Sequence, residues 1–132
     1  MYVAAADPEK KRIQLDEVAA NLNVPRYFLG KVMKNLVKEG VLDSQKGPTG
    51  GFSINQATFK TPLIKIIAIT GEPIQFDTCV LQLRKCNAKQ PCALHHRAQQ
   101  LRDDWVGLLS TTTVGDLVRD QRPDFIKTLA IY

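Results

Sequence analysis

Two neighbouring segments near the start of the chain carry apolar residues at helical spacing. In residues 15–22 the apolar positions form one stripe, and Asp16 and Glu17 lie in the first turn, where the helix dipole favours acidic side chains. Pro25 is well placed to open a second helix, which we expect to end before Gly40, the residue type typical just past a helix C-terminus. Only Asn23 and Val24 separate the first helix from Pro25. Two helices joined by such a tight turn predict a helix-turn-helix.

The second helix is expected to have one buried face and one exposed face. The apolar positions that predict the core face are Phe28, Leu29, Val32, Met33, Leu36 and Val37. The remaining surface is expected to consist of Arg26, Tyr27, Gly30, Lys31, Lys34, Asn35 and Lys38.

A β-hairpin is predicted directly afterwards, in residues 41–55. Its tip is residues 46–51, where glycine and proline supply a turn, and Phe52 and Ile54 alternate with polar residues as in a half-buried strand. A hairpin beside a helix-turn-helix is a wing, so this part of the chain predicts a winged helix. A glycine-rich loop can also cradle a nucleotide phosphate, but no Gly-Lys-Ser/Thr ending follows, which disfavours a nucleotide site.

Further helices are predicted after the hairpin. Thr61 and Pro62 are expected to form the cap and first turn of an apolar helix that reaches Thr70. From residue 91 or 92 to about 109, apolar residues recur at spacings of 4, 3, 4 and 3, a narrow stripe typical of a coiled-coil seam. We expect this helix to dimerise rather than to pack on its own domain, since a chain of 132 residues has little other surface to cover it. The stripe consists of Leu94, Ala98, Leu101, Trp105 and Leu108.

The last predicted element is a short helix through Val118. Thr113 and Asp116 have the spacing of a capping box, in which each side chain bonds the other residue's backbone N–H group. The fold class that we expect is therefore mostly α, with a small β-wing and a long C-terminal dimerisation helix.

Charge and composition narrow the function. The net charge is +5, and residues 25–46 carry five basic side chains against two acidic ones. This balance is compatible with a polyanionic partner, although a solvated helix face gives the same pattern. No apolar run is long enough to cross a bilayer, and the N-terminus does not read as a secretory signal, so a cytoplasmic location is expected.

Three cysteines within fourteen residues suggest a metal site. Cys79, Cys86 and Cys92 are followed by His95 and His96, with the spacing Cys-x6-Cys-x5-Cys-x2-His. In a reducing compartment, clustered thiols are more typical of metal binding or redox activity than of disulfides. The close Cys-x2-Cys pairs of zinc fingers are absent, and wider loops suit an iron-sulfur cluster. An exposed polar role for His95 stays equally open at this point.

The order of these elements resembles the Rrf-type family of bacterial winged-helix regulators, which includes IscR, NsrR and CymR. The resemblance spans about residues 13–118, and residues 1–6 resemble only the end of the family's longer first helix. The segments that carry it are residues 16–19, 25–29, 40–42 and 46–52 and the three cysteines followed by Leu94 and His95.

The resemblance implies a homodimeric repressor that binds a palindromic operator in double-stranded DNA, and not an enzyme. It also implies an iron-sulfur cluster, 2Fe-2S or 4Fe-4S, on Cys79, Cys86 and Cys92, with His95 as a candidate fourth ligand. Such a regulator would sense iron-sulfur, redox or nitric-oxide status. In the DNA interface we expect phosphate contacts from lysines and base contacts near the helix start. The candidate DNA-binding residues are Arg26, Tyr27, Lys31, Lys34, Lys46 and Thr49.

Three regions follow from this interpretation. Residues 1–71 are expected to form the DNA-binding domain, residues 72–92 a cysteine-bearing loop, and residues 92–132 the dimerisation helix and a final helix. Two other functions remain open: a cluster-free regulator that responds to thiols or to a partner, and, more remotely, a small thiol oxidoreductase. The absence of a Cys-x-x-Cys motif disfavours the oxidoreductase.

Overall fold

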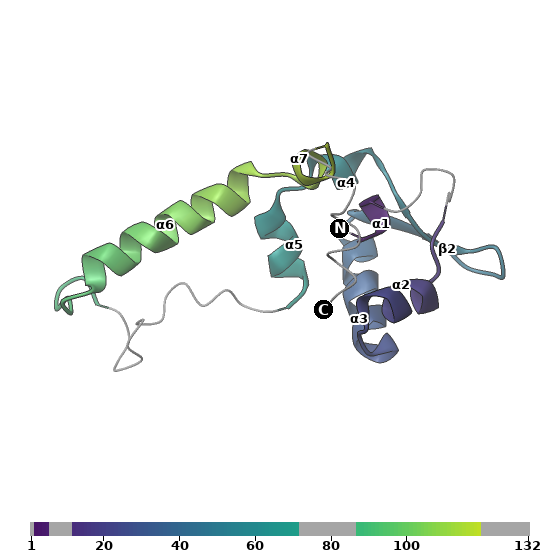
Figure 1. Ribbon diagram of the computed structural model, residues 1–132, viewed down its shortest axis with the longest axis horizontal. Coiled ribbons are helices and arrows are strands. Elements are labelled where there is room, and N and C mark those ends of the chain that lie inside the picture. The colour runs from purple at the N-terminus through teal and green to yellow at the C-terminus, as the bar shows by residue number, and fades with distance from the viewer. Residues whose placement is uncertain (1, 6–11, 72–86, 120–132) are drawn as a thin grey trace.

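Helices dominate the computed structural model, which describes residues 2–5, 12–71 and 87–119 (Figure 1). Helix α6 projects from the other elements as an arm. The other labelled helices and the strands gather beyond its C-terminal end, near α7 (Figure 1). The elements are α1 (Tyr2–Ala5), α2 (Leu15–Leu22), α3 (Arg26–Lys38), β1 (Leu42–Gln45), β2 (Gly51–Ile54), α4 (Gln56–Lys60), α5 (Leu63–Ile69), α6 (His95–Thr111) and α7 (Val114–Arg119).

The predicted helix-turn-helix is present as α2 and α3. Asn23 adopts a left-handed conformation with a φ of 51°, and the N–H group of Val24 returns to the carbonyl of Ala19 at 3.1 Å, which closes the tight turn. Pro25 stands at the start of α3, and Gly40 follows its end with a φ of 72°. The proline and glycine signals therefore marked both ends of α3 correctly.

The wing is an antiparallel hairpin in which Leu42 pairs with Ile54 and Gln45 with Gly51. Ile13, before α2, adds one further pairing, because Ile13 and Phe52 exchange two backbone hydrogen bonds of 2.9 and 2.8 Å. Gly51 permits this approach: a Cβ atom at that position would lie 2.6 Å from the Ile13 carbonyl oxygen. The wing is thus fastened to the start of the helix-turn-helix.

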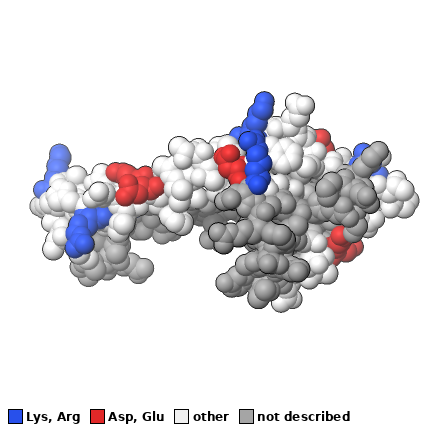
Figure 2. Space-filling view, turned by 45° about the horizontal axis from the view of Figure 1, so that its top comes forward, with Lys and Arg blue, Asp and Glu red and all other residues white. Residues whose placement is uncertain are grey.

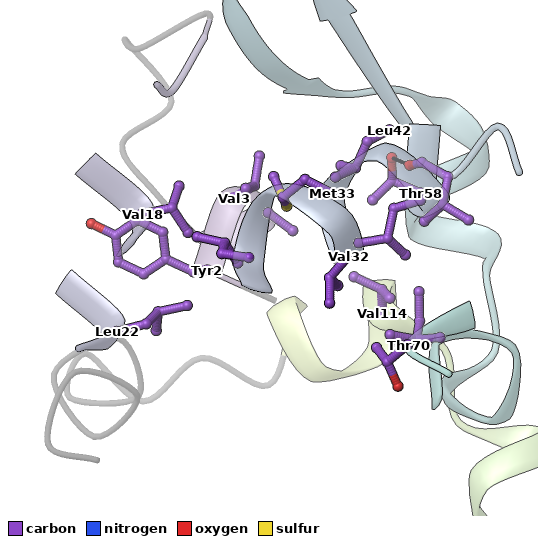
Figure 3. A pocket seen from close by; sticks show the side chains of 15 residues that line it. Tyr2, Val3, Val18, Leu22, Val32, Met33, Leu42, Thr58, Thr70 and Val114 are labelled. Carbon is purple, nitrogen blue, oxygen red and sulfur yellow. Dashed lines mark hydrogen bonds between the residues drawn. The ribbon is translucent and has the colours of Figure 1, made fainter. Parts of the chain in front are cut away.

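A single apolar core joins these elements. Its buried residues come from the segment before α2, from α2 and α3, and from the start of the wing, and they are Ile13, Val18, Ala19, Leu29, Met33, Leu36, Val41 and Leu42. Tyr2 of α1 packs beside Val18 and Leu22 of α2, at the edge of a cavity of about 200 Å³ with a mainly apolar lining (Figure 3). The short helix α1 therefore completes the wall of the core.

Two expectations about α3 were wrong. Phe28 does not belong to the core, since 53% of it is exposed. Gly30 does not lie on the outer surface but faces α2, because a Cβ atom built on it would lie 3.4 Å from the Leu15 side chain. Both errors have the same origin: residues 28 and 30 lie on opposite flanks of the helix, about 100° on either side of Leu29.

The segment after the wing contains one helix that the sequence pattern did not predict. Asn55 caps α4 in a capping box with Thr58, whose backbone N–H group bonds the Asn55 side chain at 3.0 Å. Thr61 does not cap α5 as expected, because its hydroxyl donates to the Ala57 carbonyl at 2.7 Å and Pro62 precedes α5 without a side-chain cap. The predicted apolar helix is otherwise present as α5.

The base of α6 is joined to the winged domain by two backbone hydrogen bonds. The N–H group of Leu63 donates to Thr112 at 2.9 Å, and that of Val114 donates to Thr61 at 3.0 Å. These bonds align the start of α5 with the start of α7. Among the described residues, no helix is both long and apolar enough to span a bilayer.

Candidate DNA-binding surface and cysteine segment

The outer face of α3 is a row of basic and aromatic side chains, and we call Tyr27, Lys31, Lys34 and Lys38 the α3 outer face. All four are exposed, and Tyr27 is exposed at 89% of its surface. The opposite side of the helix is fixed by the buried side chains of Leu29, Met33 and Leu36. Burial of one side therefore obliges α3 to present its lysines to solvent.

The start of α3 combines free backbone donors with positive charge. The first N–H groups of any helix lack partners within the helix, and Pro25 provides no side-chain cap for α3. Arg26, in the first turn, pairs with Asp16 of α2, and 67% of each side chain is exposed. An ion pair so open to water contributes little to stability, so Arg26 can exchange Asp16 for another acceptor at low cost.

The tip of the wing carries two of the six residues that the sequence analysis placed in the DNA interface. Lys46 and Thr49 are exposed on either side of a turn in which Gly50 donates to the carbonyl of Gly47 at 3.0 Å. The Gln14 side chain donates to the Pro48 carbonyl at 3.2 Å, which ties the tip to the segment before α2. The candidate residues of the wing are therefore accessible.

The cysteine segment is described only in part. Cys79 and Cys86 lie outside the described residues, whereas Cys92 is half-buried and lies just before α6. The helix begins at His95 rather than at residue 91 or 92, so Cys92 and His95 do not share a helical face as expected. A turn connects them instead, in which the His95 N–H group donates to the Cys92 carbonyl at 3.0 Å.

His95 differs from its neighbour in its surroundings. Only 7% of His95 is exposed, while His96 is exposed and meets the His95 ring edge to face, with the centroids 5.4 Å apart. Within the described ranges no group of three potential metal ligands comes together. Cys92 and the buried His95 are thus joined by a backbone hydrogen bond at the far end of α6. Their donor types suit an iron-sulfur cluster whose other two thiols lie outside these ranges.

The predicted seam of α6 faces solvent in this chain. Leu94 is 41% exposed, Leu101 70%, Trp105 53% and Leu108 55%. The buried residue near the base of the helix is Leu109, which lies beside this stripe. Figure 2 shows basic side chains at the far end of the arm and acidic ones halfway along it, where Asp103 and Asp104 are exposed. The arm therefore presents an apolar stripe without covering side chains from the described part of its own chain.

Comparison with known proteins decides the family. The Rrf2 family, described as iron-dependent transcriptional regulators, matches residues 1–120. The chain belongs to the Rrf2 family. This Rrf2 protein is 36% identical over 108 residues to an Aquifex aeolicus protein named as an HTH-type transcriptional regulator, a match that covers 80% of the chain and 75% of that relative. It is 23% identical over 121 residues to the HTH-type transcriptional regulator IscR of Escherichia coli, covering 92% of the chain and 74% of IscR.

Solved structures confirm the fold of this Rrf2 protein. CymR, the global cysteine regulator of B. subtilis, matches with a TM-score of 0.69 at 20% identity, over 91% of the chain and 87% of CymR. IscR of T. potens matches with a TM-score of 0.64 at 16% identity, over 94% of the chain and 81% of that protein. The expected winged-helix architecture and the expected family are therefore both confirmed, and the activity of the family is transcriptional regulation through DNA.

The structure of this Rrf2 protein adds one surface residue that sequence reasoning missed. Phe28 was assigned to the core, yet it stands exposed beside Tyr27 at the start of α3. The sequence could have indicated this exposure, because position 28 is rotated by about 100° from Leu29 and lies at the margin of the apolar stripe.

Proposed function

We propose that the chain is a homodimeric repressor in which α3 enters the major groove of a palindromic operator. The observation that carries this proposal is the α3 outer face, whose three lysines are exposed together on the second helix of a helix-turn-helix. In such motifs the N-terminal residues of the second helix reach base edges, so Arg26 and Tyr27 are the proposed base contacts. Lys31, Lys34 and, from the wing, Lys46 and Thr49 are proposed to hold the backbone.

Salt dependence tests this division of roles. Each phosphate contact that is removed should lower the slope of log affinity against log salt by about 0.9, because fewer counterions are released. We expect this change for Lys31→Gln, Lys34→Gln and Lys46→Gln, measured by fluorescence anisotropy on an operator selected from a random duplex pool. Lys89→Gln is the matched control and should leave the slope unchanged, since Lys89 is exposed in the turn before α6 and α6 begins at the end of the arm away from α3 (Figure 1). Unchanged slopes for all three lysines of the interface would contradict the proposal.

The same proposal gives α6 the role of a dimerisation helix. Its seam is apolar, straight and exposed, and paired helices bury such stripes by knobs-into-holes packing. A palindromic operator requires two heads in a two-fold arrangement, which a symmetric α6 pair supplies.

We further propose that the chain senses iron-sulfur, redox or nitric-oxide status through a cluster on Cys79, Cys86 and Cys92, with His95 as the fourth ligand. Support comes from the donor types, the wide cysteine spacing and the adjacency of Cys92 to the buried His95. When bound, the cluster would supply an exchangeable, redox-active centre. Cys92 and His95 then hold the first turn of α6, so a change in their ligation reorients that turn and, through the dimer, the spacing of the two α3 helices.

The experiment for the sensing role is anaerobic reconstitution of the full chain. We expect visible charge-transfer absorption with stoichiometric iron and sulfide, and loss of both on Cys→Ala substitution at any of the three positions. Operator affinity should differ between the cluster-loaded and cluster-free dimers at matched salt. Iron-free protein that still binds the operator would replace this proposal with a cluster-free, thiol- or partner-responsive regulator.

A further inference from the structure

Two large aromatic side chains stand exposed side by side in the first turn of α3. Tyr27 is 89% exposed and Phe28 53%. Phenylalanine has no polar group, so its exposure leaves an apolar surface in water that the core of the same domain could have covered. The position has a specific setting, since the chain neighbour of this pair is Arg26 and the next turn brings Lys31, both exposed.

On α3, Phe28 lies between the buried side of the helix and the α3 outer face. Leu29, Met33 and Leu36 occupy the buried side, and Phe28 lies about 100° around the helix from Leu29. Lys31, three residues further on, is its neighbour on the same flank. Phe28 therefore lies at the edge of the α3 outer face. A ligand that binds the lysines of this face also comes close to Phe28.

The charge around this aromatic pair favours a polyanion as its occupant. Lys31 lies on the same flank of α3 as Phe28, and Lys34 extends the α3 outer face beside it. A ligand that covers Phe28 therefore also meets exposed lysines. Double-stranded DNA offers phosphates to the cations and, in the major groove, one apolar group on a base edge: the C5-methyl group of thymine. A phenyl ring has no hydrogen-bonding group, so this methyl group is the feature of the groove floor that suits it best.

We propose that Phe28 is a specificity-determining residue that reads a thymine methyl group in each half of the operator. This inference rests on the proposed entry of α3 into the major groove and adds the base that one side chain recognises. Tyr27, whose hydroxyl can donate and accept, is left for polar groups of bases or phosphates. The operator is thereby expected to hold an obligatory thymine at one position of each half-site, facing the first turn of α3.

The test removes one methyl group at a time. The full-length protein first selects its preferred duplex from a random pool, and each thymine of that duplex is then replaced singly by deoxyuridine. For the native protein, one position in each half-site should lose about fourfold in affinity, the factor expected when one methyl-sized group is no longer buried. Phe28→Ala should bind the thymine duplex at least about fourfold more weakly and should lose nothing further on the deoxyuridine duplex.

Matched variants separate this role from a structural one. Tyr27→Phe should retain full sensitivity to the methyl group, because it leaves Phe28 in place. Phe28→Ala should keep its affinity for a random duplex at low salt and its thermal melting, since Phe28 lies outside the buried core. If Phe28→Ala retains the deoxyuridine penalty, or if the native protein shows no penalty at any thymine, the inference is wrong while DNA binding by α3 stands. If the native protein selects no duplex at all, the proposed function fails together with it.

A change in self-association would also overturn the inference. Should Phe28→Ala alter the oligomeric state in sedimentation and leave the thymine dependence intact, the aromatic pair would be a contact between protein chains and not a reader of bases.

Discussion

The hydroxyl group of Thr58 donates a hydrogen bond of 2.6 Å to the backbone carbonyl of Val41, and both residues are buried. This bond joins α4 to the residue that precedes the wing. Thr58→Val keeps the shape but leaves the buried carbonyl unsatisfied, so we expect a loss of about 1–3 kcal/mol in the free energy of unfolding. Urea denaturation measures it. Thr58→Ser retains the hydroxyl and should recover most of the loss; equal losses in both variants would contradict this account.

Gly30 and Gly115 are both helical, yet alanine should affect them in opposite directions. A Cβ atom on Gly30 would make an ordinary contact with the Leu15 side chain at 3.4 Å, so Gly30→Ala should gain about 0.5–1 kcal/mol from helix propensity. A Cβ atom on Gly115 would lie 2.8 Å from the backbone carbonyl oxygen of Phe59. Gly115→Ala should therefore lower the midpoint of thermal unfolding while Gly30→Ala raises it. Shifts of the same sign would refute the contact of Gly30 with Leu15 of α2 or that of Gly115 with Phe59 of α4.

The capping box of α7 should make stability depend on pH. Hydrogen bonds from the Thr113 hydroxyl at 2.6 Å and from its backbone N–H group at 2.9 Å, with Arg119 nearby, hold the pKa of Asp116 below its ordinary value. The unfolded chain therefore binds this proton more readily than the folded chain. The contribution of the carboxylate is complete above the unfolded pKa, about 3.9, and is lost as pH falls through the lower folded pKa.

Asp116→Asn measures this contribution. The difference in melting temperature between the native chain and the variant should be largest near neutral pH and should shrink below about pH 4. The effect should be weaker when Thr113→Ala is present, which by itself is expected to cost about 1 kcal/mol as a lost N-cap. A difference that grows on acidification would have the wrong sign for this mechanism.

The α6 seam provides a direct test of dimerisation. Leu101→Glu places a charge at the most exposed apolar position of the stripe, where a partner helix would bury it, and should convert a dimer into a monomer in sedimentation equilibrium. Gln99→Glu adds the same charge on the exposed, opposite side of α6 and should leave the dimer intact. If the native chain sediments as a monomer, the α6 stripe does not mediate dimerisation.

The pairing of Arg26 with Asp16 predicts the behaviour of a further variant. Asp16→Asn frees Arg26 and removes a negative charge beside the proposed groove, so operator affinity should rise about two- to fivefold at low salt and less at high salt. Stability should change by less than about 0.5 kcal/mol, because the pair is exposed. Glu39→Gln, at the far end of α3, makes the same change in net charge and should have the smaller effect. Weaker operator binding by Asp16→Asn would show that Asp16 positions Arg26 instead of competing for it.

Local patterns explain how much of this fold the sequence predicts. Pro25 and Gly40 delimit α3, and Thr113 with Asp116 starts α7, because each signal acts within a few residues of its own position. The pairing of Ile13 with Phe52 has no such signal, since it joins segments 39 positions apart. Only the folded chain reveals it.

The errors have equally local causes. Helix α4 has five residues, which is too short for apolar residues to recur at helical spacing. The sequence signal for its start is the N-cap residue Asn55. Phe28 was assigned to the core because periodicity counts apolar residues without asking whether a partner element covers that flank. The start of α6 was placed at residue 91 or 92, although the apolar period begins only at Leu94, and the helix in fact begins at His95. The cysteine ligand set cannot be judged from spacing alone, and Cys79 and Cys86 lie outside the described residues.

Helix α6 is a long helix that extends from the winged domain. Its 17 residues span about 25 Å, and backbone hydrogen bonds at Thr112 and Val114 join its base to the winged domain, while Cys92 and His95 lie at the opposite end. A tilt of a few degrees at the tip is therefore carried along a stiff rod to the domain that bears α3. Among the described residues, the buried core lies in the winged domain and does not include Cys92 or His95. Substitutions at the far end of α6 can therefore accumulate over evolutionary time without disturbing that core.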